Sequence, residues 1–240
     1  MKYFKPILFF LSTLLVLSCS SDDGKISFTL LQLNDVYEIS SIQGGKFGGM
    51  ARVETIHKKL LKENKNTMLV MAGDFLNPSL LGGMKLNGEK IRGKQMIEVM
   101  NAMNFDVVAF GNHEFDIPKN DLQNRINDSS FPWISSNVFN RTKDSIKPFY
   151  QEINGLQIPI KGSFIKEISD ADGTNIKIGF ISVCIPSNPK EYVLYTDMFN
   201  SIQKEYESIK DKVDVVIGLT HVKIEHDREI ARLLPNIPLI

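Results

Sequence analysis

Apolar runs alternate with polar and glycine-rich segments along most of this chain, and four of the runs lead directly into a side chain able to bind a metal. Residues 26–33 lead into Asn34-Asp35, 67–72 into Gly73-Asp74, 105–110 into Gly111-Asn112-His113, and 213–220 into His221. Short apolar runs of this kind are typical of buried strands. Reactive groups of open α/β sheets lie beyond the carboxyl ends of the strands, so the pattern predicts a functional site where these four strands end.

Amphipathic segments separate the runs and predict helices. Met50, Val53, Ile56 and Leu60 or Leu61 recur at helical spacing, which predicts a helix over residues 50–62. We interpret His57 on this helix as a solvated surface residue, because lysines surround it. Further helices are expected at residues 93–104, from Pro118 to about 126, at 198–210 and at 225–234. Strand, helix and strand follow one another from residue 67 to 110, which predicts parallel strands with right-handed crossovers in an α/β fold.

The middle of the chain departs from this alternation. Residues 131–135 predict another strand, and residues 147–168 predict antiparallel strands joined by a turn at Asn154-Gly155. The strong apolar run at 176–185 contains Cys184, which we interpret as a buried, inert thiol.

Length and charge limit the classes of protein to consider. A chain of 240 residues is long enough for one sizeable core, with any embellishments attached to it. Lys plus Arg equals Asp plus Glu at 28 each, so the net charge gives no indication of a nucleic-acid partner.

The first residues are typical of a secretory signal. Lys2 and Lys5 precede an apolar run at 6–17, which is short for a membrane span but suits the apolar region of a signal peptide. The run ends in Val16-Leu17-Ser18-Cys19, which resembles the lipobox of bacterial lipoproteins, and a plain signal peptide with a chance cysteine is the alternative. We expect residues 1–19 to be a lipoprotein signal with Cys19 lipidated, residues 20–25 to be a tether, and the protein to lie outside the cytoplasm on a membrane surface.

The polar groups at the strand ends suit a transition metal. Aspartate, asparagine and histidine supply ligands fitted to Zn, Mn, Fe or Co better than to calcium. Asp74 could bridge two cations through its two oxygens. Two metals roughly 3.5–4 Å apart clamp both oxygens of an in-line displacement and can supply hydroxide at neutral pH, which points to hydrolysis of a phosphate ester.

His113 is the candidate proton donor. It directly follows the expected ligand Asn112, so its side chain should face the substrate and protonate the leaving group near neutral pH. Asp116 lies three residues on and could fix the imidazole ring and favour its charged form. The alternative is that His113 only caps the turn with hydrogen bonds.

These residues together resemble a known family. Asp35, Gly73-Asp74, Gly111-Asn112-His113-Glu114-Phe115-Asp116 and Thr220-His221 occur in the order and spacing of the calcineurin-like metallophosphoesterases, and the hexapeptide resembles the 5′-nucleotidase branch. The resemblance covers residues 26–240 and implies a four-layer α/β/β/α sandwich. It also implies Asp35 on the first of two divalent metals, Asp74 bridging, Asn112 and His221 on the second, and His113 with Asp116 as the catalytic dyad.

Two positions depart from the family pattern. Tyr37 stands where the family has the histidine of Asp-x-His; a neutral phenol is a poor ligand for Zn or Mn, although a phenolate can bind ferric iron. The chain ends at Leu239-Ile240, so we expect it to be truncated before the family's Gly-His-x-His motif and before the C-terminal domain that stacks the nucleobase. His226 does not replace these histidines, because we expect it on the surface of a helix.

Three hypotheses follow. The first is a membrane-tethered hydrolase of nucleotides or related phosphate monoesters, in which hydroxide attacks phosphorus and His113 acts as the general acid. The second is a metal-poor protein that binds a phosphorylated ligand or a partner without turnover. The third keeps the enzyme but changes the substrate to a phosphodiester or cyclic nucleotide.

Overall fold

The computed structural model describes residues 24–187 and 189–240 of the chain. The expected signal segment with Cys19, and most of the expected tether, lie outside the described residues. Within the described part, no helix has the length and apolar character needed to cross a membrane.

A four-stranded parallel sheet carries the first three of the predicted strand ends. Its strands are β1 (Thr29–Leu33), β2 (Thr67–Ala72), β5 (Val107–Ala109) and β6 (Trp133–Ile134), in the order β1-β2-β5-β6. All three neighbouring pairs are parallel, which confirms the prediction that the strand–helix–strand order gave for residues 67–110, now β2 and β5. The carboxyl ends of these strands therefore meet at one edge of the sheet.

A second sheet carries the fourth strand end. It consists of β11 (Ser163–Ser169), β12 (Asn175–Ile181) and β14 (Val215–Gly218), in the order β11-β12-β14. β11 is antiparallel to β12, whereas β12 and β14 are parallel. Leu239 extends this sheet by one parallel bridge to Ile217 of β14.

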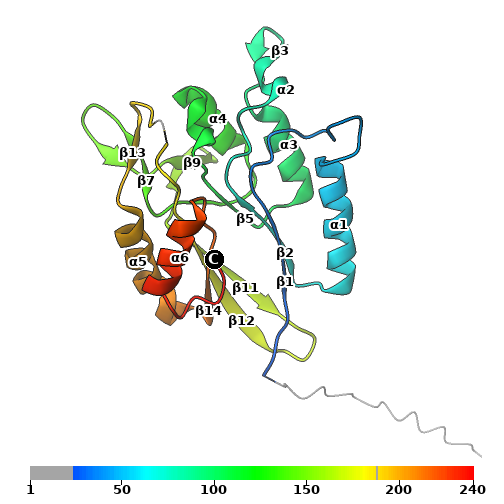
Figure 1. Cartoon of the computed structure of the whole chain (residues 1–240), viewed down its shortest axis with the longest axis vertical. Helices are drawn as coiled ribbons and strands as arrows, with labels where there is room; N and C mark the ends of the chain where they lie inside the picture. Colours follow the sequence, from blue (N-terminus) through cyan, green and yellow to red (C-terminus); the bar gives the residue numbers. More distant parts are fainter. Residues whose placement is uncertain (1–23, 188) are drawn as a thin grey trace, which may run out of the picture.

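The two sheets pack face to face between two layers of helices (Figure 1). β2 shows why, because its alternate residues belong to different cores. Met68, Val70 and Ala72 pack against the second sheet, in a core shared with Ile178 and Phe180. Leu69 and Met71 face the opposite way, into the core formed with the helices α1 (Met50–Glu63), α3 (Lys94–Met103) and α4 (Lys119–Asp128).

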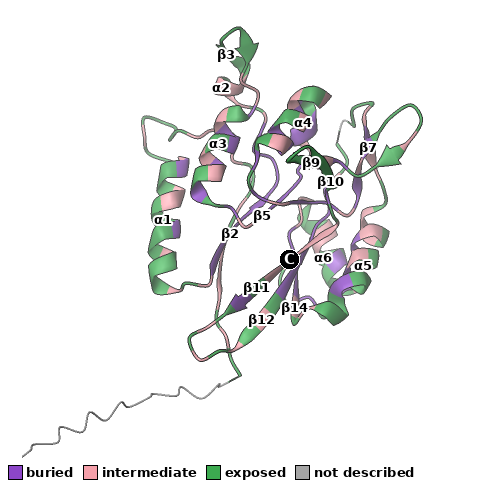
Figure 2. Ribbon diagram, turned by 180° about the vertical axis from the view of Figure 1, so that it is seen from behind, coloured by how far each residue is buried: buried purple, intermediate pink, exposed green. Residues whose placement is uncertain are grey.

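The outer face of the second sheet is covered in the same manner. Ile181, Val183 and Val216 pack against α5 (Met198–Ile209) and α6 (Ile224–Leu233). Buried residues gather along the central strands and the inward sides of the helices (Figure 2). The layers are therefore α/β/β/α, which confirms the predicted fold class.

Short elements complete the chain outside the two main sheets. They are α2 (Leu80–Gly83), the hairpin β3 (Lys85–Leu86) and β4 (Glu89–Lys90), the three-stranded sheet β13-β7-β8 (Val193–Tyr195, Val138–Arg141 and Ile146–Lys147), the hairpin β9 (Tyr150–Ile153) and β10 (Leu156–Pro159), and the 3-10 turns η1 (His113–Asp116) and η2 (Lys210–Lys212). β9 and β10 are antiparallel, and Asn154 and Gly155 between them have φ of 53° and 77°, which confirms the predicted turn.

The prediction for the exposed side of α1 was wrong. His57 is only 6% exposed, and its Nδ1 lies 3.3 Å from Glu54 Oε2, whereas Ile56 is 51% exposed. The buried face follows Met50, Val53, His57 and Leu60, which have helical spacing as good as the set that includes Ile56. His226 is also not a free surface residue, because it is half-buried with its ring edge-on to Phe199.

Candidate metal centre and catalytic dyad

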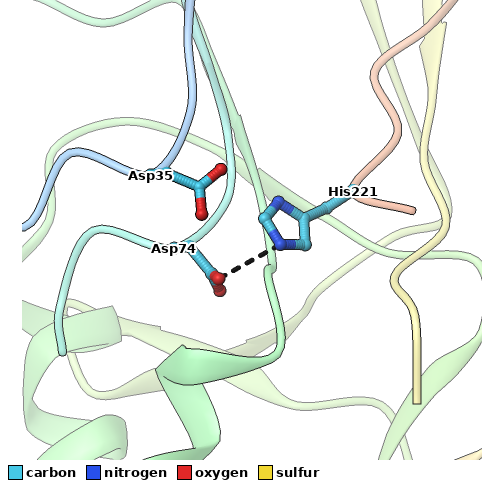
Figure 3. Close-up of side chains that lie close together, drawn as sticks. All are labelled: Asp35, Asp74 and His221. Carbon is cyan, nitrogen blue, oxygen red and sulfur yellow. Dashed lines mark ion pairs between the residues drawn. The ribbon is translucent and has the colours of Figure 1, made fainter. Parts of the chain in front are cut away.

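Three side chains from the two sheets converge at the carboxyl ends of the strands. Asp35 follows β1, Asp74 follows β2 and His221 follows β14, and one ligand atom from each lies within 4.8 Å of the other two (Figure 3). Because β1 and β2 are parallel and in register, Asp35 and Asp74 leave the sheet side by side, and the Asp35 amide donates to Gly73 O at 3.1 Å. We call Asp35, Asp74, His221, His113 and Asp116 the strand-end site.

The backbone of two aspartates at this edge of the sheet is held in an unfavourable conformation. Asp35 and Asp74 have φ of 54° and 59°, in the left-handed region that costs a non-glycine residue free energy. A Cβ on Gly73 would lie 2.4 Å from the Gly111 nitrogen, and a Cβ on Gly111 would lie 2.1 Å from Asp74 Oδ1. The glycines of the two motifs are therefore required for the close approach of the β2 and β5 ends.

Glu114 holds the two loops together. Its carboxylate is fully buried; one oxygen accepts the amides of Asp74 and Gly111 at 2.8 and 2.6 Å, and the other accepts those of Phe75 and Leu76 at 2.8 and 3.1 Å. Burial and the nearby Asp74 raise the pKa of Glu114, while the amide donors act in the opposite direction. This role of Glu114 is not evident from the sequence, because three of its four amide partners lie about forty residues away in the chain.

Asp74 receives donors from two sides. Oδ1 accepts the His113 amide at 2.7 Å, and Oδ2 lies 3.1 Å from His221 Nε2. Burial favours the neutral acid, but donation from His221 and His113 outweighs it and lowers the pKa of Asp74.

His221 is oriented as a metal ligand needs. Its Nδ1 lies 2.7 Å from the Ala72 carbonyl oxygen, which can only accept, so Nδ1 carries a proton and Nε2 faces the cluster. Burial disfavours the imidazolium, but the pairing with Asp74 prevails and raises the pKa of His221 to about 9. A divalent metal bound to Nε2 would displace the proton that Nε2 carries in the imidazolium form. Two carboxylates and one oriented imidazole fit Zn or Mn by their donor chemistry.

Tyr37 binds both carboxylates of the cluster through its hydroxyl. The oxygen lies 2.9 Å from Asp35 Oδ1 and 3.2 Å from Asp74 Oδ2. Burial and the two carboxylates raise the pKa of Tyr37 above its ordinary value, so the phenol remains a donor. In this geometry Tyr37 competes for the oxygens that a metal would use.

His113 and Asp116 lie on the turn η1 beside the cluster. His113 Nδ1 is 2.6 Å from Asp116 Oδ2, and Nε2 is 4.0 Å from Asp74 Oδ2. The hydrogen bond to Asp116 raises the pKa of His113, although burial opposes this. The His113 side chain is 40% exposed, so the imidazole lies at the surface beside the cluster.

The two other predicted residues differ in their placement. Asn112 is the half-buried residue immediately before η1, and its assignment as a ligand stays a prediction. Cys184 is buried, as predicted, and pairs in parallel with His221. The His221 amide donates to Val183 O at 2.9 Å, so this strand positions the histidine.

The comparisons with known proteins agree with this fold. A model of the calcineurin-like phosphoesterase family matches residues 28–236. The chain therefore belongs to the calcineurin-like metallophosphoesterases.

Several 5′-nucleotidases are similar in sequence to this chain. The chain is 29% identical over 230 residues to snake venom 5′-nucleotidase of Naja atra, covering 90% of this chain and 40% of that one. It is 27% identical over 231 residues to human 5′-nucleotidase, covering 90% of this chain and 38% of that one. The crystal structure of a 5′-nucleotidase precursor from Thermus thermophilus shares the fold, with a TM-score of 0.66 at 22% identity over 85% of this chain and 39% of that one. The chain thus spans about two fifths of the length of these relatives.

Proposed function

We propose that this chain hydrolyses phosphate monoesters, with 5′-nucleotides or related nucleotide esters as the substrate class. The observation that carries the proposal is the His113–Asp116 pair, 2.6 Å apart, beside three converging ligand atoms. A turn that served only for packing would not need an accessible, carboxylate-oriented imidazole next to a metal-type cluster.

The cluster supplies the binding function. Asp35, Asp74 and His221, with Asn112 as a further predicted ligand, would hold divalent metals. When bound, such metals supply positive charge for phosphoryl oxygens and make water a stronger nucleophile at neutral pH. Glu114, Gly73 and Gly111 keep Asp74 in position before any substrate arrives.

His113 supplies the proton. Asp116 accepts from Nδ1 and leaves Nε2 to face the ester oxygen that departs. The water oxygen forms a bond to phosphorus, the ester P–O bond breaks with its electron pair on the leaving oxygen, and Nε2 protonates that oxygen. A proton from the water restores the imidazolium, and the products are an alcohol and inorganic phosphate.

The relatives support the substrate class and the compartment. Proteins named 5′-nucleotidase match nine tenths of this chain at 27–29% identity. One of them is a venom protein, which agrees with a place outside the cytoplasm. We propose a membrane tether through lipidated Cys19, and mass spectrometry that found this cysteine unacylated in the mature protein would contradict it.

The test is phosphate release from AMP and from p-nitrophenyl phosphate with Mn²⁺ or Zn²⁺ added. His113→Ala should lower kcat by about 10²- to 10⁴-fold, the usual contribution of a general acid, with metal content unchanged. His57→Gln, in α1 and outside the strand-end site, is the matched control and should retain the wild-type rate. Equal rates for wild type and His113→Ala would remove the assigned role. Faster turnover of cyclic AMP than of AMP would redirect the proposal to a phosphodiesterase.

One observation favours a second candidate, a protein that binds a phosphorylated ligand without turnover. The Tyr37 hydroxyl lies within hydrogen-bond distance of an oxygen of each carboxylate in the cluster and can donate its proton to either. Metal analysis after purification separates the two candidates: a chain that retains no metal and releases no phosphate, yet binds AMP, is the second one.

A further inference from the structure

Lys190 brings an ammonium group to the far side of the dyad. Its Nζ lies 3.6 Å from Asp116 Oδ1, while the other oxygen of the same carboxylate, Oδ2, holds His113 Nδ1 at 2.6 Å. Lys190 lies in the loop before β13, so it comes from a different part of the chain than η1. In the part of the chain that the structure describes, Lys190 is the only lysine or arginine that forms an ion pair with a residue of the strand-end site.

The loop that carries Lys190 is fixed to the dyad. The Tyr192 hydroxyl lies 3.1 Å from the Phe115 carbonyl oxygen and 3.0 Å from that of Ile117, the residues on either side of Asp116. The Val193 amide closes a turn on Lys190 O at 2.9 Å. The backbone of Lys190 is therefore held against η1 by contacts that do not involve its own side chain.

The ion pair itself leaves the ammonium available. At 3.6 Å the pair is longer than a hydrogen bond, and the Lys190 side chain is 44% exposed. Exposed pairs of this kind contribute little to stability, and the flexible four-carbon stem of lysine lets the charge turn to another anion. Phosphate oxygens are anions that lysine binds well as a point charge.

We propose that Lys190 binds the leaving group and favours substrates in which that group is itself a phosphate, such as nucleoside diphosphates, over monophosphates. The inference rests on the proposed function, because His113 marks the side from which the leaving oxygen departs. AMP releases a neutral ribose hydroxyl there, whereas ADP releases AMP, and we expect the exposed, flexible Lys190 side chain to turn from Asp116 to the phosphate of this leaving group. For ADP, water adds to the terminal phosphorus, the bridging P–O bond breaks with its electron pair on the bridging oxygen, and that oxygen takes the His113 proton. The proton lost by water restores the imidazolium, and the products are AMP and inorganic phosphate.

The test compares ADP with AMP in the whole chain at equal free Mn²⁺, by calorimetric binding and by phosphate release. Lys190→Ala should weaken binding of ADP, and lower kcat/KM for ADP, by about tenfold, as expected for a lost charge-assisted hydrogen bond, and change AMP by less than about twofold. Lys190→Arg keeps the charge and should recover most of the difference.

Lys210→Ala is the matched control. Lys210 forms an ion pair of similar exposure with Glu207, but it lies in η2 before β14, at the opposite end of that strand from His221. Lys210→Ala should leave the binding and turnover of both ADP and AMP unchanged. If the wild type binds both ligands and Lys190→Ala changes them equally or not at all, the inference about Lys190 is overturned while the proposed function stands. If the wild type neither binds nor hydrolyses AMP or ADP, the proposed function fails and this inference with it.

Discussion

A glycine lies directly against a carboxylate in two regions of the molecule, the strand-end site and a groove beside α5. In the site, a Cβ on Gly111 would lie 2.1 Å from Asp74 Oδ1; in the groove, a Cβ on Gly162 would lie 2.3 Å from Glu205 Oε2. The groove has a volume of about 1110 Å³ and is lined by hydroxyl groups, lysines and apolar side chains between α5 and β11. We call it the α5 groove.

The difference between the two regions is in how the carboxylate is held. Asp74 is short, buried and fixed by the His113 backbone amide and by His221. Glu205 is half-buried on a long side chain, and its closest partner is the Ser163 hydroxyl at 2.6 Å. A large cavity does not by itself make a reactive site; convergent groups in fixed positions do. The same kind of substitution should therefore have different effects in the two regions.

The largest difference is expected from neutralising a carboxylate. Glu114→Gln replaces one acceptor oxygen by a donor, so two of the four amides that point at this side chain lose their partner. Each unsatisfied buried group costs about 1–3 kcal/mol, so the loss of two should lower the free energy of unfolding by roughly 2–6 kcal/mol in urea titrations. Glu205→Gln in the α5 groove should stay within about 0.5 kcal/mol of the wild type, as most partly exposed substitutions do. Equal losses in the two variants would show that the amides around Glu114 are not its main constraint.

The next difference is expected from adding a methyl group to the two glycines. In Gly111→Ala the new carbon would meet the Asp74 backbone nitrogen at 2.5 Å as well as its carboxylate, so the chain itself must move. Such overpacking costs about 1–3 kcal/mol, and the displaced Asp74 should also abolish Mn²⁺ binding in calorimetry. In Gly162→Ala the obstacle is the flexible end of Glu205, which can turn into solvent, so stability should change by less than about 1 kcal/mol. Unaltered Mn²⁺ binding by Gly111→Ala would contradict the close packing of the two loops.

Much of the fold followed from the sequence because the central strands are buried on both faces. β2 has six buried residues in a row, so its apolar run was easy to recognise, and the order of elements then indicated parallel pairing. The ends of the strands were less predictable. β6 has two residues where five were expected, because a short strand at the edge of a sheet leaves little hydrophobic pattern in the sequence. His57 was misplaced because lysines surround it in the sequence, and only packing shows that its side of α1 is the buried one.

The positions of the site residues were predictable where a polar side chain directly follows the apolar run of a strand. Asp35, Asp74, His113, Asp116 and His221 converge in the structure as their positions after apolar runs indicated. Glu114 was missed because its task depends on amides of residues 74–76, which only the folded chain brings near it. Lys190 was missed for the same reason, since nothing in its own neighbourhood of the sequence points to Asp116.

The smallest difference is expected from removing a hydroxyl that donates to a carboxylate. The Tyr37 hydroxyl lies 2.9 Å from Asp35 Oδ1 in the strand-end site, and the Ser163 hydroxyl lies 2.6 Å from Glu205 Oε1 in the α5 groove. Tyr37→Phe frees oxygens that point at a metal position, so Mn²⁺ affinity in calorimetry should rise by about two- to tenfold, the worth of one hydrogen bond. Ser163→Ala frees an oxygen with no convergent ligands beside it and should leave Mn²⁺ affinity unchanged. A lower affinity in Tyr37→Phe would mean that the phenol positions Asp35 and Asp74 for the metal instead of competing with it, and the difference between the two regions would then lie in the hydroxyl as well as in the carboxylates.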